Sequence, residues 1–221
     1  MLTKDELAKY IDHTLLKPTA TLEEIKLLCL EAREYGFKSV CVNSCYVRQA
    51  VDFLKDSAVN VAVTVGFPLG AMSTASKVFE AVEAIKAGAV EVDMVMNVGL
   101  LKSGDFYYVV EDISQVVKAV KDINNDSIIK VILEMCYLDE SEKVSACQLA
   151  KDAGADFIKT STGFGSGGAT IEDVKLMKKL AGDSMGIKAA GGIRDLNTAL
   201  AMIEAGATRI GTSSGIAIIK D

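Results

Sequence analysis

Two lysines end short apolar segments that have the character of β-strands, and their position suggests amine chemistry. Lys159 follows Phe157-Ile158, Lys188 follows Ile187, and a glycine-rich stretch comes soon after each lysine. A single lysine in such a place is typically a rim residue whose ammonium group reaches into water. Two of them on successive strands would lie close together, because neighbouring strands are about 5 Å apart. Like charge and burial then lower the pKa of one amine, and a neutral amine can attack a carbonyl group to form a Schiff base.

Asp93 is the candidate acid or base beside these amines. Strand alternation places Asp93 on the same face as Glu91 and Asn97, and places Lys130 and Glu134 on one face of the next strand. If both faces look inward, Asp93 pairs with Lys130 or with an active-site lysine. We expect Asn97, at the end of its strand, to be among the substrate-binding residues.

Small and hydroxyl-bearing residues follow the last two predicted strands, at Gly191-Gly192 and Ser213-Ser214. Small residues let backbone N–H groups approach an anion, and serine adds hydroxyl donors. Barrels often hold phosphate in these two loops. Tight turns are the alternative explanation, but the pattern favours a phosphate site.

Two other glycine motifs match known signatures without their required context. Residues 163–168 read G-x-G-x-x-G, but the next strand lacks the acid that binds a dinucleotide ribose, so a flexible loop or a turn near phosphate is favoured. Residues 211–215 read G-x-S-x-G, but no histidine follows, which excludes the hydrolase interpretation.

Histidine and cysteine usage excludes further chemistries. His13 is the only histidine, which rules out a multi-histidine metal site and a nucleophile–histidine–acid triad. The five cysteines are an odd number and are typical of reduced, buried thiols in a cytosolic protein. Cys41 and Cys45 have no second pair at metal-ligand spacing, so we expect structural thiols. Cys41 ends a predicted strand, where an unsaturated aldehyde could alkylate it, although burial is the simpler reason for its presence.

The composition is that of a globular chain without a nucleic-acid or membrane partner. Of 221 residues, 24 are Lys or Arg and 30 are Asp or Glu, giving a net charge of −6. A phosphate-neutralising nucleic-acid binder would be basic. The charged N-terminus is unlike a signal peptide, and the uncharged run 57–76 contains glycine and proline and alternates like a strand, which is unlike a membrane span. We therefore expect a cytoplasmic protein.

A repeated pattern indicates the fold. Four helical segments end in a glycine that leads directly into a short apolar strand, and T-x-x-E and T-x-x-D at 21–24 and 170–173 mark helix starts. Alternating strands and helices demand parallel strands, which predicts an α/β fold of the (β/α)8 TIM-barrel type with residues 1–221 as one domain. An open doubly wound sheet is the alternative, because alternation does not show closure. The predicted strands are Asp12–Leu15, Ser39–Val42, Val61–Val65, Glu91–Met96, Ile128–Glu134, Asp156–Lys159, Gly186–Ala189 and Arg209–Gly211.

The segments around Asp93, Lys159 and Lys188 resemble the signature segments of the deoxyribose-phosphate aldolase family. The resemblance extends from residue 11 to about residue 215 and is carried by the two lysine motifs together. The matching segments are 91–97, 156–163 and 187–194, supported by 11–18, 66–70 and 211–214.

This resemblance implies a class I lyase that reversibly cleaves 2-deoxy-D-ribose 5-phosphate to D-glyceraldehyde 3-phosphate and acetaldehyde, with no metal or organic cofactor. Lys159 would form the Schiff base. Lys188 would favour the neutral form of Lys159 and, with Asp93, relay protons through water. A homodimer or a higher homo-oligomer follows by family analogy.

The resemblance also implies where the substrate phosphate binds. Some members carry a longer C-terminal tail with a tyrosine that reaches the active site, whereas this sequence stops at Asp221, so a tail-assisted step is not carried over. The expected phosphate-binding residues are Gly191, Gly192, Ser213 and Ser214, with Thr162 and Gly163 nearby.

Two alternative functions stay open at this point. Another Schiff-base barrel aldolase, such as a transaldolase-like enzyme, would also form a lysine adduct and would differ in substrate. A barrel that binds a phosphorylated metabolite without covalent chemistry would keep its ligand affinity when Lys159 is replaced.

Overall fold

The computed structural model describes residues 2–220, so Met1 and Asp221, the ends of the predicted domain, lie outside the described residues. Within this range eight parallel strands form a closed barrel in sequence order. The last strand pairs with the first, Ile210 opposite Ile11, which confirms the barrel and excludes the open sheet. The strands are β1 (Ile11–Leu15), β2 (Ser39–Val42), β3 (Asn60–Val65), β4 (Glu91–Val95), β5 (Ile128–Ile132), β6 (Phe157–Lys159), β7 (Gly186–Ala190) and β8 (Arg209–Thr212).

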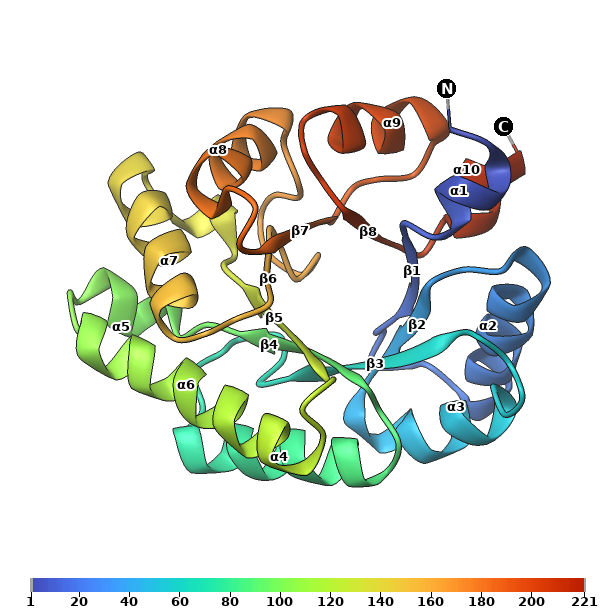
Figure 1. The fold of residues 1–221 in the computed structure, drawn as a ribbon, viewed down its shortest axis with the longest axis horizontal. Helices are drawn as coiled ribbons and strands as arrows, with labels where there is room; N and C mark the ends of the chain where they lie inside the picture. Colours follow the sequence, from blue (N-terminus) through green and yellow to red (C-terminus); the bar gives the residue numbers. More distant parts are fainter. Residues whose placement is uncertain (1, 221) are drawn as a thin grey trace.

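Helices form a ring around this barrel (Figure 1). Two elements add to the predicted alternation: α1 precedes the first strand and packs beside α10, and the short α5 precedes α6. Two 3-10 turns, at Ser44–Tyr46 and Met135–Tyr137, follow β2 and β5. The helices are α1 (Lys4–Ala8), α2 (Leu22–Tyr35), α3 (Val47–Phe53), α4 (Thr74–Lys86), α5 (Val98–Lys102), α6 (Phe106–Ile123), α7 (Glu140–Asp152), α8 (Ile171–Ala181), α9 (Leu196–Glu204) and α10 (Gly215–Lys220).

Local sequence signals explain where these helices begin and end. At the start of α2 the Thr21 hydroxyl accepts from the Glu24 N–H, and the Glu24 carboxylate accepts from the Thr21 N–H at 2.7 Å, as the capping-box pattern predicts. Thr170 caps α8 in the weaker, one-sided form. Gly36 ends α2 with φ 65°, a left-handed conformation that glycine adopts without a Cβ clash. The chain is thereby turned back into β2.

The pleat of the strands separates apolar from charged side chains. Outward residues such as Ile11, Val92, Val131 and Ile210 pack against the helices and are fully buried. The alternate residues face the lumen, and a cluster of charged side chains lies among them. The charged lumen residues are Asp12, Glu91, Asp93, Lys130, Lys159, Lys188 and Arg209, all of them buried.

An aromatic ring closes the end of the lumen where the strands begin. Phe157 starts β6, and Gly186 on β7 leaves room for it, since a Cβ at 186 would lie 2.2 Å from the ring. The guanidinium carbon of Arg209 lies 5.5 Å from the Phe157 ring centroid. Chemistry is therefore directed to the opposite end, where the strands finish.

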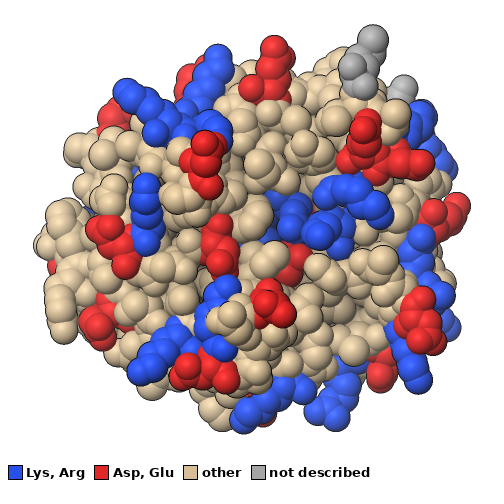
Figure 2. Space-filling model, viewed as in Figure 1, with Lys and Arg blue, Asp and Glu red and all other residues tan. Residues whose placement is uncertain are grey.

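Acidic and basic side chains are interspersed over the face shown in Figure 2. Among residues 2–220, the longest and most apolar helices still fall short of what a membrane crossing requires.

Candidate active site

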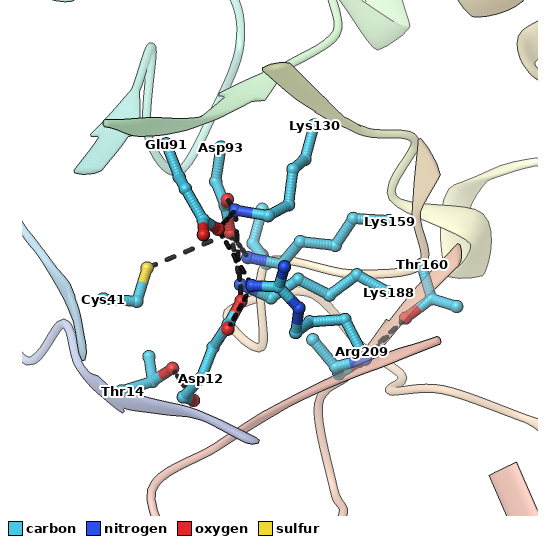
Figure 3. Close-up of polar contacts among 12 residues, drawn as sticks. Asp12, Thr14, Cys41, Glu91, Asp93, Lys130, Lys159, Thr160, Lys188 and Arg209 are labelled. Carbon is cyan, nitrogen blue, oxygen red and sulfur yellow. Dashed lines mark hydrogen bonds and ion pairs between the residues drawn. The ribbon is translucent and has the colours of Figure 1, made fainter. Parts of the chain in front are cut away.

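Lys159 and Lys188 are direct register partners on β6 and β7, as their positions in the sequence predict. Their amino groups converge on one atom: Lys159 Nζ lies 2.8 Å and Lys188 Nζ 2.7 Å from Asp93 Oδ2 (Figure 3). Both side chains point into the lumen, so neither is a rim lysine that reaches into water. Lys159 is the one that lines the cavity above them.

Asp93 is the centre of this arrangement. Its Oδ1 atom accepts from Lys130 Nζ at 2.7 Å, so the amino groups of three lysines contact this one carboxylate. Burial alone would raise the pKa of Asp93, but Lys130, Lys159 and Lys188 lower it well below its usual range. The prediction that Asp93 pairs with Lys130 or an active-site lysine is confirmed for both.

The electrostatic expectation needs a correction. Two lysines alone would repel each other, whereas in the structure both contact the Asp93 carboxylate. Burial would lower the pKa of Lys188, but Asp12, at 2.5 Å, and Asp93 raise it above its ordinary value, so Lys188 stays an ammonium group. Repulsion between two lysines is therefore only part of the balance, and the surrounding carboxylates must be counted.

A cavity of about 240 Å³ lies above Lys159 at the finishing ends of β6, β7, β8 and β1. The loops after these strands form its wall, and five residues expected to bind phosphate are among its lining. Gly191 and Gly192 have φ of 92° and 81°. Gly168 packs closely on Gly191, since a Cβ at position 168 would lie 2.3 Å from the Gly191 carbonyl oxygen. The five lining residues are Thr162, Gly163, Gly191, Gly192 and Ser213.

Two residues of the expected binding set lie elsewhere. Asn97 caps α5, with its side-chain oxygen accepting from the Leu100 N–H at 3.1 Å, because the strand has ended before this position. It is not part of the cavity lining. Ser214 is next to the lining residue Ser213, and its N–H donates to the Thr212 hydroxyl at 2.9 Å.

Sequence reasoning missed two cationic residues at the mouth of this cavity. Lys17, after β1, and Arg194, after β7, line it and are exposed. Both belong to segments that carry the family resemblance, but only loop geometry brings them beside the glycine turns.

Glu134 is a further residue whose role the sequence did not show. It follows β5 in a left-handed conformation, φ 54°, and is buried. Its carboxylate accepts from both the N–H and the hydroxyl of Thr162. Glu134 thereby fixes the loop after Lys159, and a carboxylate at a strand end was the only available signal.

The cysteines and His13 take structural positions. Cys41 is buried, and its Sγ atom lies 3.9 Å from Asp93 Oδ2. Burial raises the pKa of the Cys41 thiol to about 11, so this thiol is a poor nucleophile at neutral pH. The expectation that the thiols are buried is wrong for Cys45, which is exposed, and Cys136 is half-buried. His13 bonds Glu31 at 2.8 Å. Within the described range no cluster of histidine, cysteine and carboxylate groups is arranged to hold a metal ion.

Comparison with known proteins agrees with this geometry. Residues 6–221 match the family described as DeoC/LacD family aldolase. The chain is 60% identical to the deoxyribose-phosphate aldolase of Caldanaerobacter subterraneus subsp. tengcongensis, covering 100% of this chain and 97% of the relative. It is 58% identical to that of Thermococcus kodakarensis, over 99% and 98% of the two chains. The solved deoxyribose phosphate aldolase of Aeropyrum pernix, described as having a unique tetrameric structure, superposes with a TM-score of 0.91 at 34% identity, over 99% and 91% of the two chains.

Proposed function

The chain belongs to the DeoC/LacD family of aldolases, and we propose that it cleaves 2-deoxy-D-ribose 5-phosphate reversibly to D-glyceraldehyde 3-phosphate and acetaldehyde. The observation that carries this proposal is the placement of Lys159. Lys159 lines the cavity, while Asp93 and Lys188 are fully buried. Both lysine amino groups contact the same oxygen of Asp93.

The chemistry needs a carbonyl to become an electron sink. The neutral Lys159 amine attacks C1 of the open-chain sugar, and loss of water leaves an iminium. Removal of the proton from the C3 hydroxyl then drives cleavage of the C2–C3 bond. The bonding electrons pass to C2 and the iminium, which gives an enamine, and glyceraldehyde 3-phosphate departs.

Asp93 and Lys188 supply the proton path. The C3 hydroxyl proton passes through water to this pair, and a proton returns to C2 of the enamine. Water then hydrolyses the resulting iminium, releasing acetaldehyde and free Lys159. The ammonium of Lys188, held by Asp12 and Asp93, also stabilises the carboxylate while protons move.

The phosphate group would lie on the loops after β7 and β8. The proposed donors in the cavity lining are the backbone N–H groups at Gly191 and Gly192 and the Ser213 hydroxyl, with Thr162 and Gly163 on the facing loop. The hydroxyl of Ser214, which is next to Ser213 but outside that lining, is a further proposed donor. Lys17 and Arg194 add positive charge at the mouth. The cavity thus has the Lys159 amine at its base and the proposed phosphate-binding loops at its side.

The deciding experiment is reductive trapping. Acetaldehyde and borohydride should attach an ethyl group to Lys159, located by peptide mapping, and Lys159→Ala should lose both adduct and cleavage. Lys151→Ala, a change at an exposed lysine on α7, should retain both. An adduct on another lysine, or cleavage by Lys159→Ala, would refute the assignment.

The trapping experiment also separates the two alternative functions. A barrel that only binds phosphorylated ligands would form no adduct at all, and a transaldolase-like enzyme would prefer dihydroxyacetone units as donor over acetaldehyde. The high identity to deoxyribose-phosphate aldolases favours acetaldehyde.

Self-association and a cytoplasmic location are also proposed. The Aeropyrum pernix relative is described as tetrameric, and Phe79 and Tyr107 on α4 and α6 are 69% and 80% exposed, which supports a homo-oligomer. Light scattering after gel filtration tests it. The five cysteines are free, as is usual in a reducing compartment.

A further inference from the structure

The charges in the lumen do not balance. Strand by strand, the titratable and charged groups that face Lys159 and its neighbours carry four cations and three carboxylates within the described barrel (Figure 3). The Cys41 thiol is neutral because its pKa is raised, and Glu134 lies at the mouth on Thr162. The groups are Asp12 on β1, Cys41 on β2, Glu91 and Asp93 on β4, Lys130 on β5, Lys159 on β6, Lys188 on β7 and Arg209 on β8.

Contact geometry shows which cation is in surplus. Lys130 lies 2.6 Å from Glu91 and 2.7 Å from Asp93, and Lys188 lies 2.5 Å from Asp12 and 2.7 Å from Asp93.

Arg209 likewise has two carboxylate partners, Asp12 at 2.8 Å and Glu91 at 2.9 Å. Lys159 contacts Asp93 alone, and it is the cation of this set that borders the cavity. An uncompensated charge in a dry interior is costly, and Lys159 is the cation of this set with the fewest carboxylate contacts.

Arg209 and Glu91 control this surplus from a distance. They are the first residues of β8 and β4, at the end of the lumen that Phe157 closes, and do not border the cavity. Each is linked to the reacting end through the shared partners Asp12 and Lys130.

We infer that Arg209 and Glu91 are positioning residues that set the pH at which Lys159 becomes a free amine, by fixing the total charge of the buried cluster. This inference rests on the proposed function, because it concerns the amine that forms the Schiff base. The two residues act with opposite sign. Removing Arg209 leaves a balanced cluster that retains the Lys159 proton, and removing the Glu91 charge enlarges the surplus.

The test is the pH at which half of the protein is trapped by acetaldehyde and borohydride in a short fixed time, between pH 5 and pH 10. Arg209→Met should raise this midpoint by about one pH unit, and Glu91→Gln should lower it by about the same amount. The double variant, which restores the count, should return near the wild-type midpoint. Shifts in the same direction, or no shift, would overturn the inference.

A charge-conserving variant separates electrostatics from packing. Arg209→Lys should keep the wild-type midpoint even if its melting temperature falls. A shift equal to that of Arg209→Met would show that the shape of the side chain, and not its charge, matters. If Arg209→Met does not fold, the trapping midpoints of Glu91→Gln and Arg209→Lys still test the inference. The midpoint should fall for Glu91→Gln and stay unchanged for Arg209→Lys.

The two proposals fail in different ways. Wild-type protein that forms no adduct on Lys159 at any pH contradicts the aldolase function. Wild-type protein that forms the adduct, with variants whose midpoints do not separate, contradicts only the role of Arg209 and Glu91.

Discussion

Two regions of this molecule bury lysines completely, and they differ in how the charge is balanced. Between α4 and α6, Lys77 pairs with Asp112, and Thr74 donates to the same carboxylate at 2.8 Å. Inside the barrel, lysines share carboxylates and one cation is left over. The Lys77–Asp112 pair is matched one to one and does not border the cavity. A surplus makes one amine available for chemistry, so burial of lysine alone does not indicate reactivity.

The largest expected effect is on kcat, and it should distinguish Asp93 in the lumen from Asp112 between α4 and α6. Asp93→Asn should lower kcat about 1000-fold, because it removes the proton acceptor and the shared partner of the two lysines. The matched change Asp112→Asn should leave kcat within about twofold for the folded protein, since it is remote from the cavity. Coupled assays of glyceraldehyde 3-phosphate release measure both, and equal losses would erase the distinction.

The next largest effect is a loss of stability on breaking the ion pair between α4 and α6. Lys77→Met strands the buried Asp112 carboxylate and should lower the free energy of unfolding by about 3–5 kcal/mol. Adding Asp112→Leu should recover most of that loss, because an apolar pair of similar volume can replace a buried ion pair. Urea unfolding gives the values. A double variant as unstable as the single one would mean that the pair itself is required.

The smallest effect tests how tightly the lumen lysines are placed. A Cβ at Gly211 would lie 2.9 Å from Lys188 Cε and 3.0 Å from Ala190 Cβ. Gly211→Ala should therefore displace the Lys188 amine and lower kcat about tenfold, with little change in KM. Gly99→Ala on α5, where the nearest atom is 3.6 Å away, is the control. A normal kcat for Gly211→Ala would show that the position of Lys188 is adaptable.

The parts of the fold that depend on local signals could be predicted from the sequence. The predicted strands agree with those observed to within two residues, because apolar runs mark them and, in four cases, a glycine ends the preceding helical segment. The pairing of Lys159 with Lys188 at one level of the barrel was also predictable, since register partners on neighbouring strands need only equal height.

Contacts across the lumen could not be predicted in this way. Asp12 meets Lys188 and Arg209 meets Glu91 only because β1 and β8 close the ring. Which side chains meet across a barrel depends on strand tilt and stagger, which no local pattern records. Asn97 lies outside the cavity lining for a related reason, since the strand ended two residues before it and a helix began.

The ring of Phe157, seated where Gly186 has no side chain, has a consequence for traffic through the enzyme. The Phe157 ring and the Arg209 guanidinium group occupy the end of the lumen where the strands begin. Sugar, aldehyde and exchanging protons therefore all reach Lys159 through the cavity at the other end.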